Sequence, residues 1–388
     1  MAEAYIVAAV RSAGGRPGGG LADVHPVDLG AAIIDALLDH GNFDPALVED
    51  VLFGCVSQTG EQSNNAARDV VLASRLPALK PGVTIDRQCG SSQQALHFAA
   101  QAVMSGAMDV VVAGGIDSMS RAPMGRFAGF AAKNGFGDHE GSEIERRFPG
   151  PGFSQFTGAE MVAAKYGFSR ETLDRFALES HQKAARAVQS GAFASEIVPI
   201  SVASGAAAWH DQDEGVRFDA SLASIGAVKP LKGGGVITAA NASQMCDGAS
   251  GVLVVNDRGL KTLGATPLAR LGQMSAIGGD PVITLDAPAD ATADALKRAG
   301  LTVDDIDLFE VNEAFAPIPL AWLQRTGADP ARMNVRGGAI ALGHPLGASG
   351  TKLATTLIHA LIATGAHRGL LTLCEGGGMA KATIIERC

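Results

Sequence analysis

The sequence predicts an α/β fold built from two similar halves, with a third segment inserted between them. Strand-like and helix-like segments alternate through the first 118 residues, which is typical of mainly parallel or mixed sheets covered by helices. The same alternation returns after the apolar run 252–256. Residues 119–245 differ, because they combine loops rich in glycine and phenylalanine with two amphipathic helices.

Local sequence matches indicate that one half duplicates the other. Residues 48–54 resemble residues 305–310, and residues 105–112 resemble residues 364–371. Each copy then reaches a pair of glycines, which are Gly114-Gly115 and Gly376-Gly377. A repeat of this length is too long for a solenoid. We therefore expect a functional site at the carboxyl ends of the strands, where the two halves face each other.

The elements of the first half and of the insert follow from apolar runs and helix-start residues. Short apolar runs predict strands over 5–10, 51–56, 83–85 and 110–113. Pro26 and Asp28 open a helix that continues to about His40. Apolar periodicity predicts further helices that end near Ser74 or cover 95–103, 159–166 and 171–190.

Composition excludes several functional classes. Hydrophobic residues make up 47% of the 388 residues and charged residues 18%, as in globular proteins. A formal charge of −9 argues against nucleic-acid or anionic-membrane partners. The five cysteines are widely spaced without a CxxC pair, so neither a disulfide framework nor a zinc site is suggested. We expect a cytoplasmic protein with no membrane span and no metal.

Cys89 is the first candidate catalytic residue, because it stands between a predicted strand and a predicted helix. Free N–H groups and the dipole at a helix N-terminus stabilise an anion, so a thiol there is expected to ionise more easily. Gly90 lets another molecule approach the backbone. The chemical interpretation is a nucleophilic cysteine, and the alternative is a small buried hydrophobe.

Three stretches of the second half add reactive side chains. Asn312 and Glu313 follow a strand directly, His344 lies in a glycine-rich loop before a long helix, and Cys374 follows another strand. Taken one at a time, each has an ordinary alternative. Asn312-Glu313 could be a polar turn, His344 a histidine with its hydrogen bonds made within the fold, and Cys374 a small buried hydrophobe. Together with Cys89 they supply a nucleophile, a base and a second thiol that moves protons. Backbone N–H groups at Cys89 and Gly376 could bind an oxyanion, so the set predicts acyl transfer through a thioester.

These blocks resemble those of the thiolase family, the acetyl-CoA C-acyltransferases, over nearly the whole chain. The matching blocks, in chain order, are Cys89-Gly90-Ser91, Asn312-Glu313-Ala314-Phe315, Gly343-His344-Pro345 and Cys374-Glu375-Gly376. The resemblance implies that Cys89 is the acylated nucleophile and His344 its base. It implies that Cys374 exchanges the α-carbon proton of acetyl-CoA. Asn312 would hold a water that forms one oxyanion site with His344, and the N–H groups of Cys89 and Gly376 would form the second.

The resemblance also implies how substrates and subunits are arranged. Arg217 and Ser243 match coenzyme A contacts of the family, Arg217 through its spacing to Pro230. Coenzyme A and acyl-CoA are then substrates, and no cofactor is bound permanently. The loop 60–68 is similar to the family's subunit-interface loop, which implies a homodimer or homotetramer.

We predict three domains on this basis. The N-terminal thiolase half covers residues 1–118 plus 246–268. Residues 119–245 form an inserted loop domain that binds coenzyme A, and residues 269–388 form the C-terminal half.

Departures from the common family pattern bear on the substrate. Ser92-Gln93, Arg336 and Ala380 replace frequent family residues, and Ser154-Gln155-Phe156-Thr157-Gly158 is more similar to bacterial degradative and steroid-side-chain thiolases. We therefore expect cleavage of 3-ketoacyl-CoA or the reverse condensation. The alternative within the family is a short-chain enzyme that forms acetoacetyl-CoA, and the alternative from another class is an inactive acyl-CoA-binding scaffold.

Six phenylalanines between residues 126 and 156 suggest the size of the acyl group. A glycine-rich segment of this kind is expected to form an adaptable apolar wall rather than a regular element. Burial of extra acyl carbons against it would favour chains longer or bulkier than acetoacetyl. The alternative is that these rings only pack the insert onto the rest of the protein.

Overall fold

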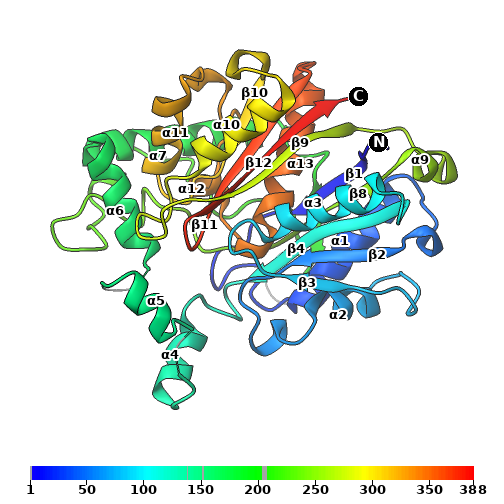
Figure 1. The fold of residues 1–388 in the computed structure, drawn as a ribbon, viewed down its shortest axis with the longest axis horizontal. Coiled ribbons are helices and arrows are strands. Elements are labelled where there is room, and N and C mark those ends of the chain that lie inside the picture. Colours follow the sequence, from blue (N-terminus) through cyan, green and yellow to red (C-terminus); the bar gives the residue numbers. More distant parts are fainter. Residues whose placement is uncertain (1, 138, 151–152, 203–207) are drawn as a thin grey trace.

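The computed structural model describes residues 2–137, 139–150, 153–202 and 208–388, which Figure 1 shows as a ribbon. Most strands belong to a single sheet, and their bounds are β1 (Tyr5–Ser12), β2 (Asp50–Gly54), β3 (Val83–Ile85), β4 (Val110–Ser118), β5 (Ile197–Val198), β8 (Asp247–Val255), β9 (Ala269–Gly278), β10 (Leu308–Val311), β11 (Arg368–Glu375) and β12 (Met379–Arg387). A small separate sheet pairs β6 (Ile200–Ser201) with β7 (Trp209–His210).

Thirteen α-helices lie among these described residues. Their bounds are α1 (Pro26–His40), α2 (Ala66–Ala73), α3 (Ser91–Met104), α4 (Arg126–Lys133), α5 (Ser142–Arg147), α6 (Gln155–Tyr166), α7 (Arg170–Gln189), α8 (Leu222–Gly226), α9 (Asp257–Leu263), α10 (Pro288–Ala299), α11 (Pro317–Thr326), α12 (Ala339–Leu342) and α13 (Ser349–Thr364). In the stretches that the structure describes, no helix is both long and apolar enough to span a membrane.

The main sheet confirms the predicted α/β class and is mixed. Its order is β10-β11-β12-β9-β1-β8-β4-β2-β3, with β5 beside β1. Parallel pairing joins β3, β2 and β4, joins β10 to β11, and joins β5 to β1. The strands in the middle are antiparallel, contrary to the mainly parallel alternative. A three-residue turn joins β11 to β12, and a connection that short permits only antiparallel pairing.

Two helices, α3 and α13, form a layer that the strands of both halves contact. The two helices pack against each other, and α13 contacts β1 and β8 as well as β10 and β11. Their small apolar side chains, together with those of the adjacent strands, make one buried core. A second core lies under α1 and α2, and a third lies under α10 and α11. This layering brings the N-terminal ends of α3 and α13 to the same region of the molecule.

Several element boundaries differ from the sequence-based predictions. The strand β4 continues through Gly114-Gly115 to Ser118, where we expected it to stop at the glycines. Cys374 lies inside β11 rather than just past its end. The phenylalanine-rich segment contains α4 and α5, so the expectation that it forms no regular element was wrong. The helix propensity of the alanine and charged residues in α4 and α5 outweighs the unfavourable propensity of the segment's glycines. In Figure 1 these two helices extend away from the rest of the molecule.

The close approach of the two halves at Gly115 can be tested by substitution. A Cβ atom on Gly115 would lie well inside van der Waals contact of the Gly347 carbonyl oxygen. We expect Gly115→Ala to lower the free energy of unfolding by about 1–3 kcal/mol, as overpacking does in a buried core. Urea unfolding measures this change. The control is Gly129→Ala in α4, where a Cβ meets no atom within 4 Å and alanine favours the helix. Equal stability of the two variants would contradict this packing.

Candidate active site

Cys89 lies in a tight loop between β3 and α3 that local hydrogen bonds hold in place. Gln88 adopts a φ of +50°, in the left-handed region that a residue with a side chain rarely occupies. Asp86 Oδ1 accepts a hydrogen bond from the N–H of Gln88 at 2.8 Å. Ser91 Oγ accepts from the N–H of Arg87 at 2.8 Å and donates to the Gln88 carbonyl at 2.6 Å. The loop therefore holds Cys89 partly exposed just before α3.

The loop 343–350, which carries His344, packs against the start of α3. The N–H of Thr351 donates to Ser92 Oγ at 3.1 Å. A Cβ atom on Gly350 would collide with the backbone of Gln93, so the two chain segments are in direct contact. A glycine-rich stretch of the second half thus contacts the helix that follows Cys89.

The ring of His344 is fixed by hydrogen bonds on both nitrogen atoms. Nδ1 lies 2.5 Å from Ser349 Oγ, and that hydroxyl also bonds to the Pro345 carbonyl at 2.8 Å. Because the hydroxyl donates its single hydrogen to the carbonyl, it must accept a hydrogen from Nδ1. Nε2 lies 3.4 Å from Asn312 Nδ2, which is a donor. Both contacts favour the tautomer in which Nε2 carries no hydrogen and can take a proton.

The electrostatics of the site keep its resting groups neutral. Burial, and then the neighbouring Cys374 and Glu375, raises the pKa of Cys89 well above its ordinary value. The expectation of an easily ionised thiol was wrong for the resting site, because desolvation of the thiolate outweighs the helix N-terminus. Burial and the charge of Lys352 lower the pKa of His344 to about 3. At pH 7 the thiol of Cys89 keeps its proton and the imidazole of His344 is unprotonated, which is the form of histidine that can act as a base.

The other predicted site residues lie at the ends of strands of the second half. Cys374 is fully buried within β11, and burial raises the pKa of its thiol to about 12. Gly376 follows β11 and faces the side chain of Gln88. Asn312 follows β10 and is buried beside His344. These positions bring both halves of the chain to Cys89.

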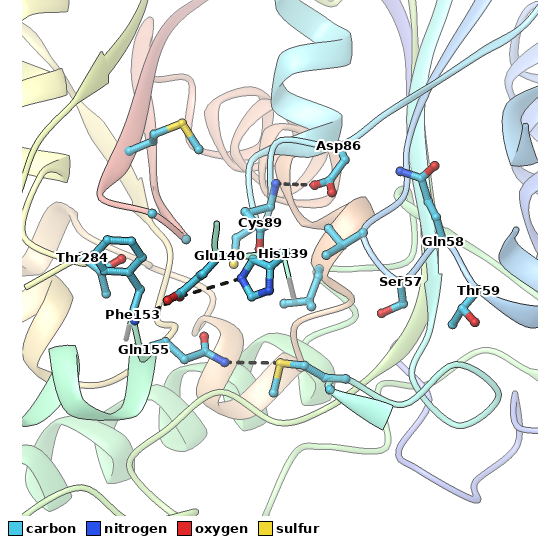
Figure 2. A pocket seen from close by; sticks show the side chains of 18 of the residues that line it. Ser57, Gln58, Thr59, Asp86, Cys89, His139, Glu140, Phe153, Gln155 and Thr284 are labelled. Carbon is cyan, nitrogen blue, oxygen red and sulfur yellow. Dashed lines mark hydrogen bonds and ion pairs between the residues drawn. The ribbon is translucent and has the colours of Figure 1, made fainter. Parts of the chain in front are cut away.

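A cavity of about 650 Å³ gives access to Cys89, and Figure 2 shows its lining. Cys89 and Gly376 belong to that lining, whereas His344, Asn312 and Cys374 are buried and do not. Much of the rest is apolar and includes Met124, Ile144, Phe153, Leu346 and Met379. Among the residues that the structure describes, no group of three or more histidine, cysteine or acidic side chains could hold a metal ion.

The two predicted coenzyme A contacts lie apart from this cavity. Arg217 lines a second cavity of about 450 Å³ together with His181 and Ser224. Ser243 is not in that lining, although its neighbour Gln244 is. The N–H of Ser243 donates to the Ala314 carbonyl at 2.9 Å, which ties the insert to the segment that follows Asn312.

Sequence reasoning missed three side chains that support the site. Ser349 orients His344, and Lys352 Nζ donates to the Leu342 and Gly343 carbonyls at 2.6 and 3.0 Å. Asp117 accepts hydrogen bonds from the N–H groups of Gly347 and of the loop after β2. One sequence signal was available, because Lys352 is the single Lys, Arg, Asp or Glu residue in α13.

Comparisons with known proteins agree with this geometry. Residues 4–258 match the N-terminal domain of thiolases, and residues 265–387 match the thiolase C-terminal domain. The chain belongs to the thiolase family. It is therefore an acyltransferase.

Individual relatives cover the whole chain. A steroid 3-ketoacyl-CoA thiolase of Mycobacterium tuberculosis is 49% identical over 100% of this chain and 95% of its own length. An acetyl-CoA acetyltransferase of Escherichia coli is 40% identical over 100% of both chains. The crystal structure of the Bacillus anthracis acetyl-CoA acetyltransferase superposes with a TM-score of 0.90 at 33% identity, covering 100% of this chain and 99% of the other.

The raised pKa of Cys89 predicts how its alkylation depends on pH. Because the thiolate is the reactive form, iodoacetamide should modify Cys89 slowly at pH 7 and faster as the pH rises. The midpoint is expected above about 8.5, the ordinary value for a cysteine thiol. Peptide mass spectrometry at a series of pH values measures the rate at Cys89 separately from that at the exposed Cys388. A midpoint below that of an ordinary thiol would show that the helix N-terminus dominates after all.

Proposed function

We propose that this thiolase cleaves 3-ketoacyl-CoA with coenzyme A, or runs the reverse Claisen condensation, through an acyl thioester on Cys89. The observation that carries the proposal is that Cys89 lines a largely apolar cavity, while its neighbours Gln88 and Gly90 contact residues of the second half. The proposed roles of His344, Cys374, Asn312 and Gly376 come from the resemblance to thiolases. Three observations support them: Cys374 is an electrostatic neighbour of Cys89, Gly376 lines the same cavity, and Asn312 bonds to the His344 ring.

The first half-reaction makes the acyl-enzyme. The sulfur of Cys89 attacks the C3 carbonyl while its proton passes to Nε2 of His344, whose lone pair faces away from Ser349. The C2–C3 bond then breaks, and C2 takes the proton of Cys374. Acetyl-CoA leaves, and the remaining acyl group stays on Cys89. The raised pKa of Cys374 suits this step, because its thiol holds a proton until the carbanion forms.

The second half-reaction returns the enzyme to its starting state. The thiol of coenzyme A gives its proton to the Cys374 thiolate and attacks the acyl carbonyl. Cys89 leaves as a thiolate and recovers its proton from His344. Each oxyanion that forms needs preorganised donors. We assign one donor set to Asn312 with His344, and the other to the N–H groups of Cys89 and Gly376, which line the same cavity.

We assign coenzyme A binding to the insert, residues 119–245, between the two thiolase halves 1–118 plus 246–268 and 269–388. The guanidinium of Arg217 forms no ion pair within the described residues and lines the second cavity, so it is available to a phosphate group. Ser243 borders that region through Gln244. Coenzyme A and acyl-CoA are substrates in this proposal, with no permanently bound cofactor.

Cys374→Ala tests whether Cys89 carries the acyl group while Cys374 carries the proton. The variant should still accept an acetyl group from acetyl-CoA, because Cys89 is intact. It should lose exchange of the acetyl-CoA methyl protons with deuterated water, by at least about a hundredfold, because the base for the α-carbon is gone. Proton NMR measures the exchange. Cys89→Ser is the matched variant and should fail to accept the acetyl group. Proton exchange at the wild-type rate in Cys374→Ala would refute the proposed role of Cys374.

We further propose acyl groups longer or bulkier than acetoacetyl as the preferred substrates. The similarity to a steroid 3-ketoacyl-CoA thiolase supports this, as does the apolar lining beside Cys89. Only part of the phenylalanine-rich segment supports it. Phe153 lines the cavity, whereas Phe130 and Phe136 stack on each other at 6.4 Å and are exposed.

Phe153→Ala tests this preference. We expect kcat/KM for 3-ketooctanoyl-CoA and bulkier 3-ketoacyl-CoA to fall about tenfold, since a few buried methylenes at about 0.8 kcal/mol each are lost. The value for acetoacetyl-CoA should change little. Phe136→Ala, at an exposed ring, is the control. If acetoacetyl-CoA is the best substrate of the wild-type enzyme, the short-chain alternative is correct. If no substrate acylates Cys89, the chain is an acyl-CoA-binding scaffold.

We also propose a homo-oligomer, at least a dimer, that works in the cytoplasm. β3 is the end strand of the main sheet, and Leu72, Leu79, Val83 and Phe98 are exposed near it. An open strand edge bordered by apolar side chains favours pairing with a second copy. The adjacent loop 60–68 would lie at that interface. All five cysteines are free thiols, which suits a reducing compartment.

Light scattering at micromolar concentration measures the assembly. We expect a mass of at least about twice the 39.5 kDa of one chain, because the open edge of β3 would be covered. Leu79→Lys, at a side chain that is almost fully exposed, should weaken the assembly through an unpaired buried charge. A single-chain mass for the wild-type protein would refute the proposal.

A further inference from the structure

A buried ion pair lies next to both cysteines and has no part in the reaction as proposed. Glu375 follows Cys374 on β11, and Lys381 lies on the neighbouring strand β12. Their side chains are 1% and 0% exposed, and Lys381 Nζ lies 2.6 Å from Glu375 Oε1. Within the described part of the chain, Glu375 Oε2 has no hydrogen-bond partner.

The carboxylate of Glu375 reaches the residue that follows Cys89. Its Oε1 lies so close to the Cα of Gly90 that a Cβ atom there would overlap it. Gly90 is the residue that caps α3. The Glu375 side chain therefore lies against the loop of Cys89. Only a glycine at position 90 leaves room for its carboxylate.

Stability does not explain why this pair is buried. Removing two charges from water costs several kcal/mol per ion, and the attraction offsets this only when the remaining donors and acceptors are satisfied. Here one carboxylate oxygen has no partner among the described residues. Apolar residues of similar volume would be at least as stable at such a site. The pair therefore points to a role in the chemistry.

The Glu375–Lys381 pair and the charged groups around it affect the pKa values of the two cysteines. Glu375 adds to the effect of burial in raising the pKa of Cys89 and of Cys374. Burial raises the pKa of Glu375, and the charges of Lys381 and then of Arg87, from the loop before Cys89, oppose that rise. Burial lowers the pKa of Lys381 to about 8, so its ammonium form still prevails at pH 7. His97 of α3 also faces Lys381, and burial lowers the pKa of His97 to about 3, so its ring is neutral. Lys381 is thus the main cation that offsets the carboxylate.

We propose that Glu375 and Lys381 are a positioning pair that sets how readily Cys89 loses its proton, with Lys381 cancelling the negative charge that Glu375 places beside the thiols. This inference rests on the proposed role of Cys89 as nucleophile. With the carboxylate alone, formation of a thiolate would be opposed. With the ammonium alone, both cysteines would be driven toward thiolates, and Cys374 would lose the proton that it must deliver to the carbanion.

Opposite shifts in the alkylation of Cys89 test the proposal. Glu375→Gln leaves the ammonium unpaired and should move the pH midpoint of iodoacetamide modification down by about one unit. Lys381→Met leaves the carboxylate and should move the midpoint up, by a smaller amount, because burial lowers the pKa of Lys381 to about 8 and part of its charge is already lost at the pH of the midpoint. The double variant should return close to wild type. Shifts in the same direction, or no shift in either single variant, would overturn the proposal, because a purely structural role predicts no dependence on the sign of the charge.

Matched variants separate charge from folding. Lys381→Arg keeps the positive charge and should keep the wild-type midpoint. Glu310→Gln changes another fully buried carboxyl, on β10, and should leave the midpoint unchanged. The double variant should unfold at no lower temperature than wild type, since the pair adds no stability. Alkylation needs no turnover, so it tests the pair even if the protein fails to cleave 3-ketoacyl-CoA, a result that would count only against the proposed function.

Discussion

The loop 343–350 approaches the start of α3 with almost no space between the two backbones, and the candidate site depends on this contact. Gly54 at the end of β2 and Gly115 within β4 permit the approach, because a Cβ on either glycine would collide with Gly347. The carboxylate of Asp117 then holds the N–H of Gly347 at 2.7 Å. A chain with larger residues at these points would separate His344 from the helix that follows Cys89.

Burial determines how such a site can work. Both thiols keep their protons in the resting protein and the imidazole of His344 carries no charge, because low-dielectric surroundings disfavour every isolated ion. Charge is therefore expected to appear only during the reaction, when a proton moves between neighbouring groups. The His344 ring donates from Nδ1 to Ser349 and accepts at Nε2 from Asn312, and these two hydrogen bonds orient Nε2 for that transfer.

Much of this arrangement could be predicted from the sequence, and the rest could not for physical reasons. Local pattern marked Cys89, His344 and Cys374 as candidates, and the resemblance to thiolases supplied their expected roles. The antiparallel middle of the sheet and the pairing of Glu375 with Lys381 depend on which strands become neighbours, which local pattern does not encode. The direction of the Cys89 pKa shift depends on burial, which only the folded structure reveals.

In the proposed mechanism the two thiols differ in role, one as the acyl carrier and one as the proton carrier. The most direct test is to incubate the wild-type protein with acetyl-CoA, quench at low pH, and locate the acetyl group by peptide mass spectrometry. The account predicts a single acetyl group on Cys89, the thiol that lines the cavity. An acetyl group on Cys374 instead would contradict it.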